Sequence, residues 1–427
     1  MSSLEFSLPR CKWLFAVALM IQYDSDEPLR NRVFSKNPAI VMTRAVWLLL
    51  LLALTLRIAA AVVVDQHVRN AGRTFLIEGD ANGYWELGQK IAAGQNYEIH
   101  FPPRKVLRTP GFPLFLAASI RIFGNSVFAA SLLMAAIGTA TCWLTWLLAK
   151  RLFCDRIAVI ALAIVAVSPL QIGSSIQILS EGLFSFWILI SLLSLHHLWT
   201  VATSGSEKQF LLATMLAGLT IGLGTLVRPG WLLWAVFCLP ANILTPGIPS
   251  GRKVAAVVLI PFGCWLALVP WAWRNYEATG HWVHTSLWSG PSLYDGLHPG
   301  ATGASDMTFV DQDGVYQRLN EYEANEHYKT LAVQFALKNP WRTAELAFLK
   351  AGRYLSPTLN ASGFTGGPMA IFCLVWYGLF VFFVGFGIWT LRAHLAVVFL
   401  LAGPFLQFLL VHMVFVGSIR YRLPVEF

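Results

Sequence analysis

Charged side chains are scarce in this 427-residue sequence. Asp, Glu, Lys and Arg together make up 12% of it, whereas hydrophobic residues make up 56%. A soluble domain typically has about 25% charged residues, because its surface must face water. The deficit excludes an ordinary soluble globular protein, and a lipid bilayer is the environment that suits such a composition. The sequence therefore predicts a polytopic membrane protein.

Cysteines and nucleic-acid-binding motifs are also sparse. The six cysteines all lie outside two long polar segments, residues 65–125 and 272–367, so a disulfide framework is not expected. Zinc-finger spacings and phosphate-binding glycine loops do not occur. The net charge of +9 comes from short basic clusters between hydrophobic runs, which suits membrane orientation or an anionic lipid. No nucleic-acid partner is expected.

Nine hydrophobic segments are long enough to cross about 30 Å of hydrocarbon. The sequence therefore predicts an all-α membrane bundle, with interfacial helices in the first outer loop and a small mixed segment within 272–367. The nine expected spans are 45–64, 126–149, 156–174, 183–200, 210–227, 230–246, 254–271, 368–391 and 393–416.

Basic residues gather on one side of this predicted bundle. With alternating spans, the short connections on that side hold Arg44, Lys150, Arg151, Arg156, Lys208, Arg252, Lys253 and Arg392. The positive-inside rule makes that side cytoplasmic. The two long loops then lie on the outer face of a plasma (inner) membrane. Ionisable residues from distant parts of the chain meet them there: Glu181, Arg228, Arg420 and Arg422.

Residues 1–41 differ from the rest of the chain. They contain a short apolar stretch, 13–21, that loosely resembles a signal peptide without a small-residue cleavage site. Met42-Thr43-Arg44 is followed by an apolar run, which is a plainer beginning for a membrane protein. We expect an irregular segment over 1–41 and one transmembrane domain over 42–427.

The first outer loop contains an acidic and a basic candidate for chemistry. Residues 84–91 have the pattern of an interfacial amphipathic helix, and Asp80 precedes them. Asp80 could also serve as a helix N-cap. Arg108 opens an Arg-x-Pro-Gly-x-Pro turn before an apolar helix near 114–123. Its guanidinium could bind a phosphate or simply extend to the membrane interface.

Other polar stretches point to structure more than to chemistry. The helical stretch 314–338 has the charge pattern of a solvated face. Residues 311–314 lack the spacing of a calcium loop, and His281 and His284 lack a third ligand at a suitable spacing. No cofactor is expected, and a divalent metal is not excluded.

The order of the motifs resembles that of a known enzyme class. The matching motifs are Gly-Asp-x-x-x-Tyr at 79–84, Arg-x-Pro-Gly-x-Pro-Leu at 108–114, Ser-Glu-Gly-Leu-Phe at 180–184, a glycine-rich span ending in Arg-Pro at 228–229, Pro-Trp-x-x-Arg-Asn-Tyr at 270–276, Gly-Pro-Ser-Leu-Tyr-Asp-Gly at 290–296, with two departures, and Arg-Tyr-Arg-x-Pro at 420–424. Over residues 42–427 the chain resembles the multispanning glycosyltransferases of GT-C type. These include protein O-mannosyltransferases, the lipid A aminoarabinose transferase and their bacterial relatives. Such relatives continue with further spans, so the resemblance implies a C-terminally truncated chain.

The resemblance implies transfer of a sugar, a hexose or a pentose, from a polyprenyl-phosphate donor to a lipid, glycan or protein acceptor. Inversion requires a carboxylate to deprotonate the acceptor hydroxyl and cations to hold the leaving phosphate. Asp80 matches the catalytic acidic position, and Glu181 matches a second one that would orient the acceptor or an arginine. Arg108 is the expected phosphate clamp, because guanidinium binds phosphate in a bidentate fork. The other expected substrate-binding residues are Tyr84, Arg274, Arg420 and Arg422.

Three alternatives stay open at this stage. Glu181 could be a buried acid that only pairs with an outer arginine. The whole chain could be a transporter or lipid flippase, although it has no internal repeat and its ionisable residues gather at the outer face instead of mid-bilayer. It could also be a non-catalytic membrane scaffold.

Overall fold

The protein is almost entirely helical in a computed structural model that describes residues 43–358 and 367–427. Within these residues the isolated bridge between Ile99 and Arg104 is the only β-type pairing. The prediction of an all-α fold is confirmed. The prediction of a mixed segment within 272–367 is wrong, because its described part folds into helices and loops. The predicted irregular segment at 1–41 lies outside the described residues.

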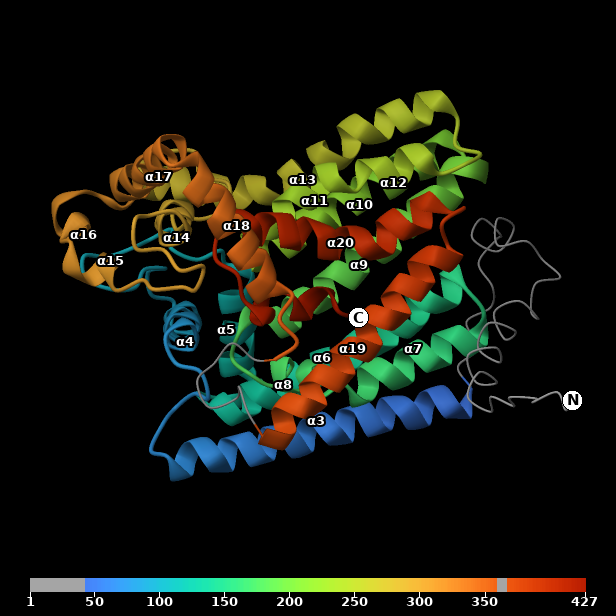
Figure 1. The fold of residues 1–427 in the computed structure, drawn as a ribbon, viewed down its shortest axis with the longest axis horizontal. Helices are drawn as coiled ribbons and strands as arrows, with labels where there is room; N and C mark the ends of the chain where they lie inside the picture. Colours follow the sequence, from blue (N-terminus) through green and yellow to red (C-terminus); the bar gives the residue numbers. More distant parts are fainter. Residues whose placement is uncertain (1–42, 359–366) are drawn as a thin grey trace, which may run out of the picture.

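Seven helices in the described part of the chain are long and apolar enough to cross a membrane, and the protein is an integral membrane protein. They lie roughly side by side in Figure 1. Their bounds are α3 Arg44–Asn70, α6 Val127–Leu152, α9 Ser180–Ser204, α10 Glu207–Val227, α13 Ser250–Thr279, α19 Gly367–Thr390 and α20 Leu395–Val414.

Two of the nine predicted spans are broken instead of continuous. The predicted span 156–174 forms α7 (Asp155–Val167) and α8 (Pro169–Ser174), because Ser168 is extended and Pro169 cannot continue the helical hydrogen bonds. The predicted span 230–246 forms three short helices: η1 (Pro229–Leu233), α11 (Trp234–Phe237) and α12 (Leu239–Leu244). Length and apolarity alone did not reveal these breaks.

Arg57, at the centre of α3, binds the backbone at the first of these breaks. Its guanidinium is buried and donates hydrogen bonds to the carbonyl oxygens of Ala166 (3.2 Å) and Val165 (3.4 Å) at the end of α7. In a continuous helix the Val165 carbonyl would accept from residue 169, but proline has no N–H. The arginine thus satisfies backbone groups that the break leaves open.

Close packing of small residues holds the centre of the bundle. On α10, a Cβ at position 218 would lie 2.3 Å from the carbonyl oxygen of Ile260 on α13, so glycine is required there. Small residues allow membrane helices to approach this closely. Beside this contact, Trp231 and Trp234 stack with ring centroids 5.0 Å apart, and Phe184 and Phe408 pack against Trp231. The outer ends of α9, α10 and α20 are therefore fixed relative to one another.

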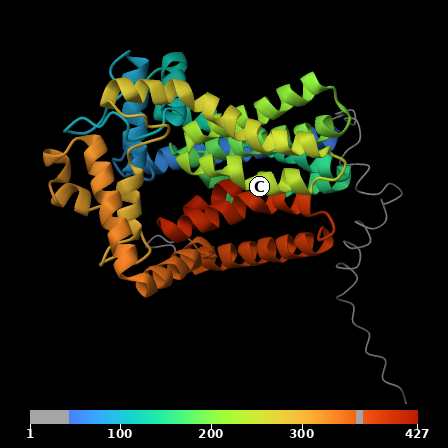
Figure 2. The same ribbon diagram turned by 90° about the horizontal axis from the view of Figure 1, so that it is seen from above.

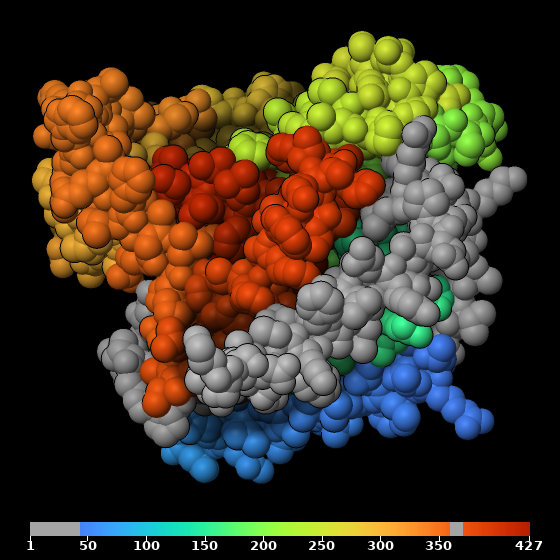
Figure 3. Space-filling view, turned by 45° about the vertical axis from the view of Figure 1, so that its right-hand side comes forward, coloured from blue at the N-terminus to red at the C-terminus, as the bar shows by residue number. Residues whose placement is uncertain are grey.

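The remaining helices gather at one end of the bundle, on the left in Figure 1, whereas the connections α6–α7, α9–α10, α12–α13 and α19–α20 lie at the other end. Figure 2 shows the same separation from above. The gathered helices are α4 Asp80–Ala92, α5 Gly111–Phe123, α14 Ser289–Gly296, α15 Phe309–Gln312, α16 Val315–Arg318, α17 Glu321–Lys338 and α18 Pro340–Tyr354. After α20, the short helices η2 Ile419–Tyr421 and η3 Leu423–Val425 lead back toward the middle of the bundle, where Figure 1 marks the C-terminus. Helices α14 to α18, residues 289–354, form a lobe that projects from the bundle in Figure 3. We refer to it as the outer lobe.

Candidate functional site

Asp80 is the first residue of α4, and its side chain does not cap that helix. Gly79 occupies the N-cap position with φ of 81°, a conformation that glycine adopts readily, and no side-chain cap hydrogen bond is formed there. The carboxylate of Asp80 is directed instead at two arginines. The capping alternative for Asp80 therefore does not describe this structure.

Arg108 and Arg420 hold the two oxygens of the Asp80 carboxylate. Arg108 Nη2 lies 2.5 Å from Asp80 Oδ1, and Arg420 Nη1 lies 2.9 Å from Asp80 Oδ2. The first arginine comes from the turn before α5 and the second from η2, near the end of the chain. Both side chains are largely shielded from solvent, so Arg108 is an ion-pair partner and not a free arginine at the membrane interface.

Glu181 continues this network at the outer end of α9. Its side chain is 3% exposed, and one carboxylate oxygen, Oε1, contacts both Arg420 Nε and Arg228 Nη1, the latter at 3.0 Å. Arg420 therefore bridges the two acids. The buried pairing that the sequence allowed for Glu181 is present, and it also orients an arginine that reaches Asp80. We refer to Asp80, Arg108, Glu181, Arg228 and Arg420 as the ion-pair network.

Aromatic rings lie beneath the arginines of the network. The guanidinium carbon of Arg108 is 4.8 Å from the ring centroid of Tyr84, and that of Arg228 is 5.1 Å from the ring of Tyr421. Such cation–π contacts favour the charged form in a partly desolvated place. The Tyr84 hydroxyl lies 3.5 Å from Ser180 Oγ, which also accepts a hydrogen bond from Arg228. Tyr84 thus contacts Arg108 with its ring and Ser180, a partner of Arg228, with its hydroxyl.

The electrostatics favour an ionised Asp80. The Arg108 guanidinium, assisted by Arg420, holds the pKa of the Asp80 carboxyl well below its usual range, although burial opposes the shift. A carboxylate in this state is charged throughout the neutral range. While both arginines remain bound it is also a weak proton acceptor, which bears on any mechanism that uses Asp80 as a base.

Two of the predicted substrate-binding arginines lie elsewhere. Arg274 donates hydrogen bonds to the carbonyl oxygens of Lys105 (2.6 Å) and Tyr97 (2.9 Å). Arg422 is fully buried and donates to the carbonyl oxygens of Tyr354 and Ser356. Both side chains are thus engaged with the protein backbone, and the structure does not bring them into the ion-pair network.

Arg228 is the member of the network that the sequence did not single out as a site residue. It follows α10 in extended conformation just before Pro229, so its side chain turns toward Glu181 at the outer end of α9. The available signal was the burial of an acid at the start of an apolar span, because such a carboxylate requires more than one partner.

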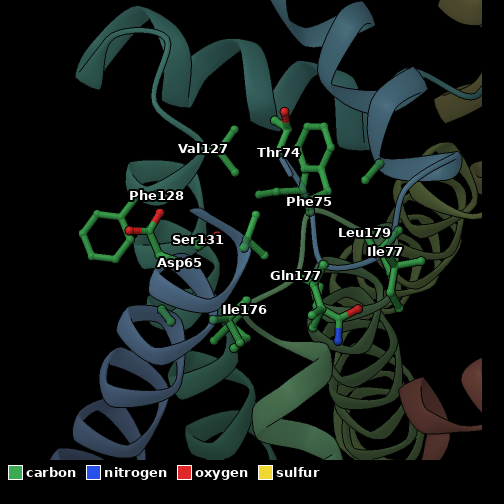
Figure 4. A pocket seen from close by; sticks show the side chains of 16 residues that line it. Asp65, Thr74, Phe75, Ile77, Val127, Phe128, Ser131, Ile176, Gln177 and Leu179 are labelled. Carbon is green, nitrogen blue, oxygen red and sulfur yellow. The ribbon is translucent and has the colours of Figure 1, made fainter. Parts of the chain in front are cut away.

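An apolar pocket of about 40 Å³ adjoins the network (Figure 4). Its walls come from the outer ends of α3 and α6 and from the loops that lead into α4 and α9. Ala81, next to Asp80, and Leu179, two residues before Glu181, line it. Asp65, Gln177, Thr74 and Ser131 add polar atoms. The pocket therefore places apolar surface beside Asp80 and Ser180.

Metal-binding clusters are absent from the part of the chain that the structure describes: no group of three His, Cys, Asp or Glu side chains there is arranged to hold an ion. His281 and His284, which the sequence did not favour as metal ligands, have other contacts. The ring of His281 stacks on Tyr322 with centroids 3.6 Å apart, and His284 lies 3.3 Å from the indole nitrogen of Trp265.

Comparison with known families matches the central part of this chain. Residues 107–273 match the family described as dolichyl-phosphate-mannose-protein mannosyltransferase. The matched region includes Arg108, Glu181 and Arg228. The resemblance to GT-C type glycosyltransferases that the motifs indicated is confirmed over this region.

Curated relatives agree with the family match. The undecaprenyl phosphate-alpha-4-amino-4-deoxy-L-arabinose arabinosyl transferase of Pseudomonas aeruginosa is 27% identical over 201 residues. Its counterpart in Pseudomonas paraeruginosa is 28% identical over 203 residues. Each alignment covers 45% of this chain and 35% of the relative, so the chain spans about a third of the length of the relatives it matches.

One solved structure has a partly similar arrangement. It is the archaeal oligosaccharyltransferase AglB from Archaeoglobus fulgidus, in complex with an inhibitory peptide and a dolichol-phosphate. The superposition has a TM-score of 0.47 at 14% sequence identity, and it covers 88% of this chain and 49% of that one.

Proposed function

We propose that this protein is a membrane glycosyltransferase that moves a sugar from a polyprenyl-phosphate donor to a lipid, glycan or protein acceptor, with inversion at the sugar carbon. The observation that carries the proposal is the ion-pair network. It joins Asp80 to Arg108 and Arg420 at one end of the bundle, in a chain whose central part matches a family named for transfer from a prenyl-phosphate sugar.

Two arginines around one carboxylate form a site that a phosphate can enter by exchange. A donor phosphate is a diester with one negative charge and presents the same type of oxygen acceptors as Asp80, so it competes for Arg108 and Arg420. When the guanidinium groups turn to the phosphate, the Asp80 carboxylate loses the partners that depress its pKa. Donor binding would in this way convert a weak base into a stronger one.

The chemical step then follows from the same groups. The Asp80 carboxylate takes the proton of the acceptor hydroxyl, and the hydroxyl oxygen attacks the anomeric carbon of the sugar. The bond from that carbon to the phosphate oxygen breaks, and its electron pair leaves with the polyprenyl phosphate. Arg108 and Arg420 stabilise the charge that develops on the departing phosphate. Attack from the face opposite the phosphate produces inversion.

Glu181 and Arg228 act on this step through Arg420. Because Glu181 Oε1 contacts both arginines, it fixes the guanidinium of Arg420 when Asp80 releases it. The burial of Glu181 makes the pairing strongly dependent on both cations. We therefore assign Glu181 and Arg228 as positioning residues, and Tyr84 as support for Arg108.

The position of the network supports an extracytoplasmic active site in the plasma membrane. The basic connections lie at the opposite end of the bundle from α4 and α5 in Figure 1, and an excess of basic residues in short loops marks the cytoplasmic side. The apolar pocket beside Ala81 and Leu179 offers surface for the hydrocarbon next to the donor phosphate.

The sugar and the acceptor follow from the relatives only by analogy. The curated relatives are named for transfer of 4-amino-4-deoxy-L-arabinose from undecaprenyl phosphate, and the matched family is named for transfer of mannose to protein. We propose a pentose or hexose on undecaprenyl phosphate as the first donors to test. A transporter or flippase is disfavoured, because the ion-pair network lies at the helix ends and not at mid-bilayer.

The test is release of polyprenyl phosphate from defined donors. Purified full-length protein in liposomes would be incubated with undecaprenyl phosphates that carry different sugars, together with membrane lipid extract or peptide acceptors. Mass spectrometry would follow free undecaprenyl phosphate and the glycosylated product. A matching Asp80→Asn protein serves as the control for chemistry. Turnover in the wild type but not in Asp80→Asn supports the proposal. Movement of intact donor across the bilayer without turnover would show that the protein is a flippase and not a transferase.

A further inference from the structure

The outer lobe braces both chain segments that supply arginines to Asp80. One segment, residues 97–109, carries Arg108, and we refer to it as the Arg108 loop. The other, residues 414–422, carries Arg420, and we refer to it as the Arg420 segment. Neither segment is a regular long helix. The Arg108 loop has a few internal hydrogen bonds, among them the bridge between Ile99 and Arg104 and the bond from the Tyr97 hydroxyl to the Arg108 carbonyl oxygen. Charged side chains of the outer lobe add contacts to the backbone of both segments.

Glu321, the first residue of α17, holds the Arg108 loop by its backbone. The Glu321 carboxylate accepts hydrogen bonds from the N–H groups of Lys105 (2.7 Å) and Val106 (3.0 Å). Arg274 binds the carbonyl oxygen of the same Lys105 at 2.6 Å. A single peptide, three residues before Arg108, is thus held from both sides by charged groups. Charge-assisted hydrogen bonds of this kind are about twice as strong as neutral ones.

Lys350 and Arg353 on α18 hold the Arg420 segment in the same manner. Lys350 Nζ donates to the carbonyl oxygen of Val414 (2.7 Å), and Arg353 Nε donates to that of Gly417 (3.1 Å). Lys350 is fully buried. Figures 1 and 2 show α18 beside the outer end of α20, from which this segment continues.

Glycines bring the backbones together at this second brace. A Cβ at position 417 would lie 2.2 Å from the carbonyl oxygen of Lys350, and one at position 296 would lie 2.6 Å from that of Phe415. The Gly417 N–H also donates to the carbonyl oxygen of Gly303. The segment therefore runs in a tight channel between α14 and α18, and its course depends on the outer lobe.

We propose that Glu321 and Lys350 are positioning residues that set the separation of Arg108 and Arg420, so that one donor phosphate can engage both guanidinium groups. This inference rests on the proposed function for the identity of the phosphate. Each residue acts through a backbone segment: the Glu321 carboxylate accepts from backbone N–H groups, and the buried Lys350 ammonium donates to a backbone carbonyl oxygen. The sequence had placed Glu321 on a solvated helix face.

The test combines the affinity for undecaprenyl phosphate, the leaving product that carries the phosphate, with local hydrogen exchange in purified full-length protein. The variants are Glu321→Leu and Lys350→Met, with Glu321→Gln as the conservative rescue. Glu345→Gln and Lys338→Met are matched controls, because both residues are exposed on α18 and α17. Undecaprenyl phosphate in detergent is the probe, and its Kd and binding stoichiometry are measured separately.

We expect the Kd to rise at least about fivefold in Glu321→Leu and in Lys350→Met, since misplacing a group by about 1 Å can cost up to about 100-fold. Amide exchange should accelerate over residues 97–109 in the first variant and over 414–422 in the second. Glu321→Gln should recover part of the affinity, and the controls should match the wild type.

Two other outcomes would overturn the proposal. One is unchanged affinity and exchange in both variants. The other is faster exchange across the whole chain, with lower stoichiometry and an unchanged Kd, which marks a general folding defect. A wild-type chain that does not bind undecaprenyl phosphate contradicts the proposed function instead. In that case the segment-specific exchange alone decides whether the two braces exist.

Discussion

The carboxylate of Asp80 and the guanidinium of Arg108 lie 2.5 Å apart, although 28 residues separate them in the chain. The pair forms because α4 begins at Asp80 and the turn before α5 returns Arg108 to the same point. Arg420 completes the pair from the other end of the sequence. Both arginines of the proposed phosphate-binding site are therefore engaged by a carboxylate of the protein itself, and this has consequences for rate, pH and affinity.

Replacing Asp80 with Asn should abolish sugar transfer without weakening the binding of the donor. Loss of a general base costs roughly 10²–10⁴-fold in rate. Donor affinity should stay equal or increase, because Arg108 and Arg420 are no longer engaged by a carboxylate. Turnover of a labelled donor and the Kd of undecaprenyl phosphate are the two measurements. Asp311→Asn, at an exposed position of α15 outside the network and the pocket, is the matched control. More than half of wild-type turnover in Asp80→Asn would exclude Asp80 as the base.

The stability that Asp80 contributes should persist down to acidic pH. Arg108, with Arg420, lowers the pKa of the folded-state carboxyl below its ordinary value of about 4. A lowered folded pKa stabilises the fold above the unfolded pKa, and this contribution is lost as pH falls through the folded one. The difference in Tm between wild type and Asp80→Asn should thus stay constant from pH 8 to 5 and shrink only below about 4. A difference that already shrinks between pH 7 and 5 would contradict the lowered pKa.

Arg108 should bind the donor phosphate through its fork geometry. Arg108→Lys keeps the charge and loses the fork, so it should weaken the binding of undecaprenyl phosphate moderately. Arg108→Ala should weaken this binding by about 2–5 kcal/mol. Titration of each variant with undecaprenyl phosphate measures the effect. Arg69→Ala is the control, since Arg69 lies at the outer end of α3 and is 71% exposed. Unaltered affinity in Arg108→Ala would leave Arg420 as the principal cation.

Much of the fold was predictable because hydrocarbon thickness sets helix length. The seven long helices coincide with apolar runs in the sequence, and the amphipathic pattern after Asp80 marks α4. The breaks at Pro169 and just before Pro240 were missed, because apolarity averaged over a window conceals a single residue without an N–H. The path of residues 272–358 was not predictable either, since its short helices depend on contacts with distant loops.

The sequence predicted which residues belong to the site better than it predicted how they are arranged. Motif order pointed to Asp80, Glu181, Arg108 and Arg420, and the structure brings these four together. Arg422 is only two residues from Arg420, yet it is turned toward the end of α18. A one-turn 3₁₀ segment sends such neighbours to different sides, and sequence proximity does not reveal which side faces the acid.

Introduced cysteines should establish which end of the bundle faces outward. Asn96, Ser305 and Ser204 are all exposed, the first two in the two long polar segments and the third at the end of α9. Cysteines at 96 and 305 should react with a membrane-impermeant thiol reagent in intact cells, and a cysteine at 204 should react only after permeabilisation. Labelling of the parent chain corrects for native cysteines. Labelling at 204 alone in intact cells would invert the orientation and move the active site to the cytoplasm.

Arg57 should stabilise the bundle through the carbonyl groups that Pro169 leaves open. Arg57→Met removes the donors to Val165 and Ala166, and an unsatisfied buried acceptor costs about 1–3 kcal/mol. The half-denaturation temperature in detergent should therefore fall, even though a charge has been removed from an apolar span.

The energetic coupling between Arg57 and Pro169 tests whether Arg57 stabilises the bundle because Pro169 lacks an N–H. Pro169→Ala restores an N–H that can bond the Val165 carbonyl, so Arg57→Met should cost less in that background than in the wild type. A double-mutant cycle measures the difference, which we expect to be about 1–2 kcal/mol. Pro240→Ala, in the other broken span, is the control background and should show no coupling. Equal losses in all three backgrounds would mean that Arg57 stabilises the bundle by some contact other than the break in α7, and a rise in stability on Arg57→Met would mean that its desolvation outweighs its hydrogen bonds.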